Sequence, residues 1–313
     1  MLTSQNQRRE APHPHCPCRL GCADGANFAI FPACVMQLPQ FQVHADLEER
    51  HWWFLGRRDI FRALLTRVLP PFRERLILDV GCGTGGNTAA FNRLYTCVGI
   101  DPSLDAVSFA RQRFPGIEFR HGYAPQDCRD LLERADAVLF LDVLEHVQDD
   151  FSLVSQLLAA MKPGAYLLMM APGDPELWGP HDRGFEHERR YSLPRFRMLW
   201  EGLSVEECVC SALNARLHPI AKLSRLFSRL RGRSLGPGQT DLSLPSAPVN
   251  ALLRWIFGGE ARRIVRAWEK RGRPYRQGVS VLALLKRRTG TIAPRMRPAS
   301  LPLDPRPWML EQW

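Results

Sequence analysis

The chain has 313 residues, 45% of them hydrophobic, so it can bury a full core as one α/β domain with an addition or as two domains. Its net charge of +10 is uneven: residues 187–313 contain 24 Lys or Arg against 9 Asp or Glu, whereas residues 1–186 contain 18 against 23. The sequence excludes a membrane-spanning helix and an ordinary secretory signal, since it has no apolar stretch of sufficient length and no charged-then-apolar start.

Residues 1–40 mix Pro, Cys, His and Gly without periodicity, which predicts a disordered leader, with Met36 as an alternative start. The cysteines and histidines of this leader lack the paired spacing of structural zinc sites, so we assign no metal. Five later cysteines are expected to be reduced and buried, as in a cytoplasmic protein: Cys82, Cys97, Cys128, Cys208 and Cys210.

A helix is predicted from about Asp46 to Val68, within an N-terminal segment 41–72. Apolar residues recur there at helical spacing, and Pro70 and Pro71 end the pattern.

A glycine-rich turn follows the first predicted strand, residues 76–80. Gly81, Gly83 and Gly85 let the backbone approach a ligand closely, and the helix that begins near Gly85 directs its free N–H groups at the same place. The turn therefore predicts a cofactor site. Its glycines, with Gly86, also fit the dinucleotide pattern G-x-G-x-x-G.

Two acidic residues distinguish between the candidate cofactors. Asp79, two residues before the turn, would repel a pyrophosphate but can hold an ammonium group. Asp101 ends the second predicted strand, residues 96–100, where an acid can accept hydrogen bonds from a ribose diol. An amine and a ribose without a required phosphate describe S-adenosylmethionine.

The motifs LDVGCGTG, VGIDPS, FLDVLEHV and MKPGAYLLMMAP, in this order, resemble those of class I S-adenosylmethionine-dependent methyltransferases, in the branch related to the ubiquinone and menaquinone methyltransferases. The segment HWWFLGRR resembles a bacterial subset linked to cell-surface glycans and natural products. The resemblance implies an α/β, Rossmann-like fold with a seven-stranded sheet whose last strand is antiparallel. It also implies that the N-terminal helix covers the cofactor, with His51 and Trp53 as candidate substrate contacts. The implied cofactor-binding residues are Asp79, Gly81, Cys82, Gly83, Gly85, Asp101, Pro102, Asp142 and Arg58.

Beyond a third predicted strand, residues 117–120, the sequence reads HGYA, where family members often carry an acid for the adenine amine. A fourth strand is predicted at 136–141. If the next residues begin a helix, Asp142, Glu145 and His146 lie on one face, where they could act as a base or bind a divalent cation. A helix start capped by Asp142 is the alternative.

The polar loop 172–191 follows the fifth predicted strand, residues 165–171, and leaves the sheet beside the cofactor site. His181 and His187 are candidate general bases, with His146 as a third. Arg189, Arg190 and Tyr191 are candidates to bind a phosphate or sugar of the acceptor. In the alternative interpretation the two arginines pair with neighbouring glutamates in a solvated loop.

A sixth strand is predicted at 203–213 and a seventh at 278–285, so residues 73–213 and 278–288 form the main domain and 214–277 an insertion. The insertion leaves the sheet at the cofactor edge, which predicts a helical lid. It contains a basic amphipathic helix, 217–231, and a second helix, 249–270. Such helices can pack on the core or lie on a membrane surface. Residues 289–313 predict a flexible basic tail.

The leading hypothesis is transfer of a methyl group from S-adenosylmethionine to an oxygen or nitrogen of a small-molecule, glycan or lipid-linked acceptor. We expect a cytoplasmic protein, peripheral to the inner face of the membrane if the lid contacts lipid. The alternatives are an NAD-dependent oxidoreductase, a catalytically silent cofactor-binding subunit and a nucleic-acid-binding module. We expect no nucleic acid partner, because the chain lacks the RNA-recognition pattern and zinc-finger spacing.

Overall fold

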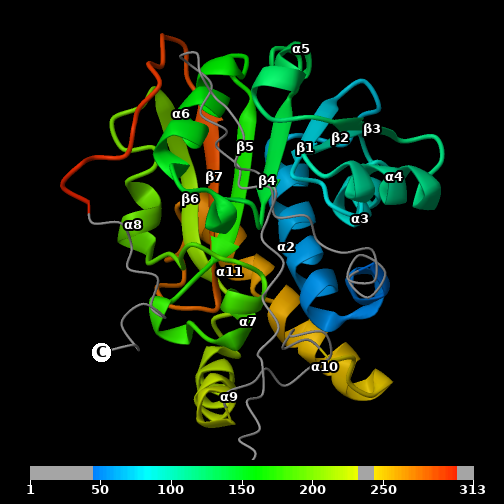
Figure 1. Ribbon diagram of the computed structural model, residues 1–313, viewed down its shortest axis with the longest axis vertical. Coiled ribbons are helices and arrows are strands. Elements are labelled where there is room, and N and C mark those ends of the chain that lie inside the picture. Colours follow the sequence, from blue (N-terminus) through cyan, green and yellow to red (C-terminus); the bar gives the residue numbers. More distant parts are fainter. Residues whose placement is uncertain (1–44, 232–242, 302–313) are drawn as a thin grey trace, which may run out of the picture.

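The protein folds around a single seven-stranded sheet, described here from a computed structural model that covers residues 45–231 and 243–301 (Figure 1). The strand order is β3-β2-β1-β4-β5-β7-β6. β7 is antiparallel to both of its neighbours, and the other pairs are parallel. This topology confirms the predicted fold. The strands are β1 (Leu76–Val80), β2 (Thr96–Asp101), β3 (Glu118–His121), β4 (Ala137–Leu141), β5 (Tyr166–Pro172), β6 (Val205–Leu213) and β7 (Ser280–Arg287).

Helices cover both faces of the sheet because its central strands carry apolar side chains on both sides. Successive residues of β4 alternate between two hydrophobic clusters, Val138 and Phe140 in one, Ala137 and Leu139 in the other. The first cluster is completed by α5 (Arg129–Leu132), α6 (Asp150–Ala160) and α8 (Leu193–Arg197), and the second by α2 (Trp52–Val68) and α11 (Ala261–Trp268). The carboxyl ends of four parallel strands lead into α3 (Gly86–Phe91), α4 (Leu104–Arg113), η2 (Leu144–His146) and η3 (Pro175–Leu177). α7 (Pro180–Gly184) follows η3, and η1 (Gln126–Cys128) precedes α5.

The N-terminal helical segment is interrupted at one residue. Residues 45–50 are helical, and α2 begins after His51, whose extended backbone and side chain cap it by accepting a hydrogen bond from the Trp53 N–H. The single helix predicted from Asp46 to Val68 is therefore two pieces. The break changes which residues of the segment face the sheet edge.

The insertion contains α9 (His218–Arg231), α10 (Ala247–Gly258) and α11. The second predicted helix is divided at Gly258 and Gly259, so that α10 and α11 both contact α2 while α9 contacts η3. Among the described residues, no helix combines the length and apolar character needed to cross a membrane.

The described part of the predicted tail, residues 289–301, is irregular but packed against α6. Arg295 accepts a hydrogen bond from the Ser155 hydroxyl at its carbonyl and returns one from its backbone N–H, at 3.4 and 2.7 Å, and its guanidinium lies over the Phe151 ring. Ile292 is buried, so this part of the predicted flexible tail is packed against the protein. The predicted leader 1–40, its cysteine and histidine group, and residues 302–313 of the tail lie outside the described residues.

Candidate functional site

The glycine turn between β1 and α3 forms an open cradle at the carboxyl edge of the sheet. The Gly81 and Cys82 N–H groups both bond to the Ile100 carbonyl, which fixes the turn against β2 at 2.8 and 3.1 Å. Gly83 has φ +52, and a Cβ added there would meet no atom of the described residues within 4 Å. At Gly81, with φ +73, a Cβ would instead collide with Val143. The cradle thus has free space at Gly83, which a bound group can fill.

Asp101 lies beside this space at the end of β2. Its carboxylate accepts hydrogen bonds from the Gly83 N–H at 2.8 Å and the Ser103 N–H at 2.9 Å. Burial raises the pKa of Asp101. Each carboxylate oxygen keeps a second lone pair, so the group can accept from a ribose hydroxyl as predicted. The carbonyl of the adjacent Pro102 bonds to Nε2 of His121 at 3.1 Å.

Asp79 is 2% exposed and accepts a 2.6 Å hydrogen bond from the Thr88 hydroxyl of α3. Burial raises its pKa to about 6. The carboxylate is therefore held below the turn by α3, and a nearby cation would favour its ionised form.

Glu48 reaches the start of α3 and was not predicted as a site residue. Its carboxylate accepts a 2.8 Å hydrogen bond from the Thr84 hydroxyl and pairs with Arg113, while Arg58 Nη2 lies 3.6 Å away. Arg58 also donates to Asn87 of α3 at 2.9 Å. Burial lowers the pKa of Arg58 to about 10. Arg58 thus lies beside the start of α3, held by Glu48, and its contact with the cofactor stays a prediction.

Arg57, which precedes Arg58 on the same helix, connects α2 to the end of β4. It is 3% exposed, forms an ion pair with Asp142 and has its guanidinium carbon 4.2 Å from the centre of the Trp53 ring. Asp142 has φ +56 and precedes the 3₁₀ turn η2, so the predicted α-helical start at this residue is wrong. This stacking places Trp53 beside the Arg57–Asp142 ion pair, and its contact with the acceptor stays a prediction.

The Cys82 side chain turns away from the cradle. It packs with Val107, Ala110 and Phe119 in a small cluster between α4 and β3, and burial raises the pKa of its thiol. Its predicted cofactor contact is therefore restricted to the main chain.

Three histidines and a glutamate gather where η2 meets the loop after β5. The ring centres of His146 and His187 are 5.0 Å apart, and those of His181 and His187 are 6.0 Å apart. Burial lowers the pKa of His146 to about 3, and burial with Arg225 lowers that of His181. These two imidazoles are neutral at pH 7. The structure thus brings the three predicted bases together from two segments.

Glu145 completes this group, and only its spacing next to His146 signalled it in the sequence. It is 1% exposed, its Oε2 has no hydrogen-bond partner among the described residues, and burial together with Asp142 raises its pKa. Its ligand atom and those of His146 and His187 lie within 4.8 Å of one another. Two imidazoles and a carboxylate at this spacing can hold a divalent cation. The sequence indicated Asp142, Glu145 and His146 as possible ligands without assigning a metal, and the structure adds His187 to this group.

His187 is oriented by a buried carboxylate. Its Nδ1 lies 3.0 Å from Oδ1 of Asp182, whose pKa is lowered by Arg190 and His187 despite its burial. An ionised carboxylate only accepts, so Nδ1 of His187 carries a proton, and the neutral form of this imidazole has its lone pair at Nε2. This arrangement suits either a general base or a metal ligand.

The three residues predicted to bind the acceptor's phosphate or sugar are structural instead. Tyr191 is fully buried and donates to the Asp150 carboxylate at 2.8 Å. Arg189 donates to the Val147 and Gln148 carbonyls. Arg190 donates to Asp182 and to the Gly173 carbonyl, both at 2.8 Å. These contacts fix the loop to the sheet, because buried guanidinium and hydroxyl groups require partners.

His51 is likewise a structural residue. It is 2% exposed, caps α2 and bonds through Nε2 to the Ser243 carbonyl at 3.1 Å. Burial lowers its pKa. Its predicted contact with the acceptor is wrong for this arrangement, since both ring nitrogens already have protein partners.

Comparison with known proteins adds independent information. The family model described as "Methyltransferase domain" matches residues 52–216. A "Probable S-adenosylmethionine-dependent methyltransferase" of Mycolicibacterium smegmatis is 28% identical over 128 residues, 40% of this chain and 48% of that protein. A "Ubiquinone biosynthesis O-methyltransferase" of Bradyrhizobium sp. is 33% identical over 101 residues, 30% of this chain and 38% of that protein. The chain thus spans half or less of the length of these curated relatives.

Solved structures give a weaker likeness. A SAM-dependent methyltransferase from Archaeoglobus fulgidus has a TM-score of 0.44 and 17% identity, and the match covers 78% of this chain and 99% of that one.

Proposed function

This chain belongs to the class I S-adenosylmethionine-dependent methyltransferases, and from that premise we propose that it transfers a methyl group to an oxygen or nitrogen of an acceptor bound at the histidine cluster. One observation carries the proposal. Gly83 follows β1, His146 follows β4, and the loop with His181 and His187 follows β5. These three strands are parallel neighbours, so the cradle and the histidine group lie at the same carboxyl edge of the sheet.

S-adenosylmethionine fits the residues present at this edge. The space at Gly83 accepts a close ligand, Asp101 offers acceptors for a ribose, and Asp79 and Asp142 supply negative charge for an amino group and a sulfonium. When bound, the cofactor supplies an electrophilic methyl group. The antiparallel β7 between β5 and β6 differs from the 3-2-1-4-5-6 order of dinucleotide-binding sheets, which disfavours the NAD alternative.

His187 is the residue best arranged to take the acceptor's proton. Asp182 holds its Nδ1–H, which leaves the lone pair at Nε2 available and stabilises the imidazolium that forms. His146 and His181 remain neutral beside it, so they add no positive charge that would oppose the protonation. Positioning of the acceptor can supply much of the remaining rate enhancement.

A second mode of acceptor activation is favoured by Glu145. Its buried Oε2 has no partner among the described residues and faces the same group as His146 and His187. A divalent cation held by these three residues would satisfy that oxygen and would lower the pKa of an acceptor hydroxyl beside it. Asp182 would then act as the carboxylate that orients a ligating histidine.

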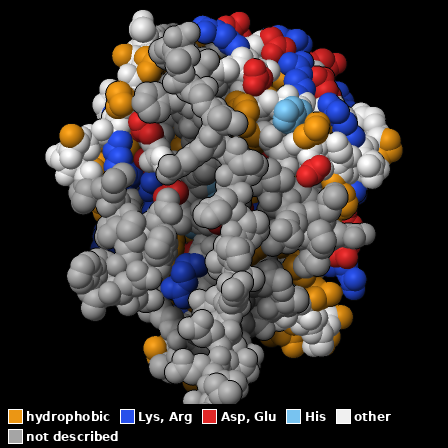
Figure 2. Space-filling model, viewed as in Figure 1, with side chains coloured by type: hydrophobic (Ala, Val, Ile, Leu, Met, Phe, Trp, Pro, Cys, Tyr) orange, Lys and Arg blue, Asp and Glu red, His pale blue; other side chains and the backbone are white. Residues whose placement is uncertain are grey.

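We propose that the part of the insertion containing α9 forms the lid. His218 bonds to Asp174 at 2.6 Å and Lys222 pairs with Glu176 at 2.7 Å, which joins α9 to the loop that carries His181 and His187. α9 exposes Ile220 and Leu223, and Figure 2 shows apolar side chains at the lower end of the molecule, where Figure 1 places α9 and α10. This apolar surface supports a lipid-linked acceptor and peripheral membrane contact.

The test is a binding and transfer experiment. S-adenosylmethionine and S-adenosylhomocysteine are expected to raise the melting temperature, and NAD is not. Labelled methyl donor should then transfer label to a component of a fractionated extract, in which the product identifies the acceptor. Stabilisation by NAD alone, or donor binding with no labelled product in any lipid, glycan or small-molecule fraction, would contradict the proposal.

A further inference from the structure

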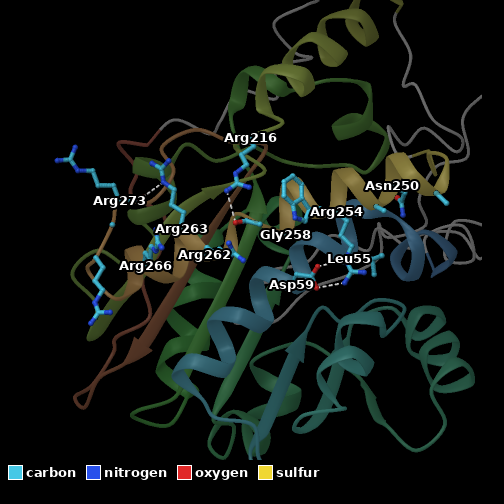
Figure 3. Close-up of a pocket in the computed structure, with 16 residues that line it drawn as sticks. Leu55, Asp59, Arg216, Asn250, Arg254, Gly258, Arg262, Arg263, Arg266 and Arg273 are labelled. Atoms are coloured by element: carbon cyan, nitrogen blue, oxygen red, sulfur yellow. Dashed lines mark hydrogen bonds and ion pairs between the residues drawn. The ribbon is translucent and has the colours of Figure 1, made fainter.

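A pocket of about 1130 Å³ lies between α2, α10 and α11, and seven arginines line it. In the part of the chain that the structure describes, Asp59 is the single carboxylate that lines this pocket (Figure 3). The lining arginines are Arg216, Arg254, Arg262, Arg263, Arg266, Arg271 and Arg273. Such an excess of one charge in a concave site attracts anions.

The pocket is separate from the methyl-transfer site. Trp53 and Arg57 face the sheet edge from α2, whereas Leu55 and Asp59, two residues further along, line the pocket. Two residues correspond to a rotation of about 200° around a helix, so the pairs lie on opposite sides of α2. A ligand in the pocket therefore leaves the cofactor cradle free.

Three of the arginines are held by the protein itself. Arg254 forms a two-point ion pair with Asp59, at 2.9 and 3.0 Å. Arg216 donates to backbone carbonyls at the end of α10, and Arg263 donates to the Arg273 carbonyl while its guanidinium lies over the Tyr275 ring. These contacts shape the wall of the pocket.

The other four arginines have no acidic partner in the part of the chain that the structure describes. Arg262 and Arg266 lie one turn apart on α11 and are exposed, and Arg271 and Arg273 follow on the next segment. Like charges one helical turn apart on the same face of a helix repel each other. A bound anion would remove this repulsion.

We propose that this pocket binds a phosphate-bearing anion. Guanidinium groups present paired donors that match the oxygens of a phosphate, and four unpaired arginines suit a ligand with more than one phosphate charge. Trp255, 74% exposed, lines the same pocket, and Leu252 and Val249 are exposed on the same helix. Apolar contacts beside a phosphate site fit a lipid headgroup, and the arginines alone fit a soluble diphosphate. This inference goes beyond the proposed function and does not depend on it.

The experiment measures binding of two probes to the full chain by titration at low and moderate salt. One probe is inorganic pyrophosphate, and the other is a vesicle of phosphatidylglycerol in phosphatidylcholine, with pure phosphatidylcholine vesicles for comparison. Arg262→Gln/Arg266→Gln should weaken binding about tenfold or more, since it removes two of the unpaired cations. Arg129→Gln/Arg134→Gln removes the same charge beside α5, whose Leu131 and Leu132 pack on the opposite face of the sheet, and should change binding less than about twofold.

Asp59→Asn gives a test of opposite sign, because it removes the single lining carboxylate and should strengthen binding about threefold. Binding of pyrophosphate would identify a soluble source, and binding of the anionic vesicles alone would identify a lipid headgroup. The proposal is overturned if neither probe binds, or if the two double variants lose the same affinity.

Discussion

The guanidinium of Arg57 forms an ion pair with the carboxylate of Asp142, which joins the N-terminal helix α2 to the end of the central strand β4. Arg57 is buried, and Asp142 keeps a left-handed backbone that Asp and Asn tolerate better than other side chains. Asp142→Asn therefore removes the charge without adding backbone strain. We expect the free energy of unfolding to fall by about 1–3 kcal/mol, because a buried guanidinium loses its anion, and methyl transfer to fall at least tenfold.

The control for this variant is Asp59→Asn, since Asp59 pairs with exposed Arg254 on the opposite side of the same helix. Its free energy of unfolding should change by less than about 1 kcal/mol. Chemical denaturation measures the free energy of unfolding of both variants, and transfer of labelled methyl groups measures their activity. Equal losses of stability and activity in the two variants would contradict the assignment of Asp142 to the site.

A glycine pair tests the cradle. Gly83 and Gly164 both have positive φ, +52 and +87, and both have open space where a Cβ would lie. Alanine at either position should cost about 1–2 kcal/mol of stability through backbone strain alone. Only Gly83→Ala should also weaken binding of S-adenosylmethionine, by about tenfold or more, because its Cβ enters the space for the cofactor. Calorimetric titration of both variants separates strain from lost binding.

The pH dependence of stability should reveal Asp79. Burial raises its pKa from 3.8 to about 6 in the folded chain, so between these values the folded state binds a proton that the unfolded state does not. The free energy of unfolding therefore falls as pH rises from about 4 to about 6, by about 3 kcal/mol from this group, and is level above. Asp79→Asn should lack this component.

The measurement is the difference between the wild-type and Asp79→Asn profiles, in which the titrations of other carboxylates largely cancel. A difference that does not change between pH 4 and pH 6 would show that Asp79 titrates normally.

Metal binding can be tested at Glu145. Because its Oε2 is buried without a partner among the described residues, Mn²⁺ should raise the melting temperature of the wild type. Glu145→Gln places a neutral amide in the same position, so it should be about as stable as the wild type without metal but should lose the rise with Mn²⁺. If neither added Mn²⁺ nor a chelator changes the melting temperature or the activity of the wild type, His187 acts without a cation.

Tyr191 provides a test of the structural assignment of the loop. Its hydroxyl donates to Asp150, which Arg195 also binds at 2.7 Å. Tyr191→Phe should lower the free energy of unfolding by about 1 kcal/mol, the net value of one hydrogen bond. It should leave kcat/KM within about twofold of the wild type. A much larger loss of kcat/KM at unchanged stability would return Tyr191 to the acceptor site.

The sequence by itself determined where the seven strands fall along the chain, the glycine turn after the first strand and the long insertion before the last one. These features depend on local signals: short runs of apolar residues bounded by glycine and proline, and an acid at the end of a strand. The sequence places Asp79, Gly83 and Asp101 in the first strand, in the turn and at the end of the second strand, and the structure has them at these positions. Their contact with the cofactor remains a prediction.

Only the tertiary structure decided which face of α2 meets the sheet. The break at His51 and a rotation of about 100° per residue determine that Arg57 reaches Asp142 while Arg58 reaches Glu48. Burial was equally invisible in the sequence, since Arg189, Arg190 and Tyr191 have the composition of a solvated loop yet have their polar groups paired inside the protein. Local patterns specify the elements, whereas side-chain partners that are distant in the chain depend on how those elements pack.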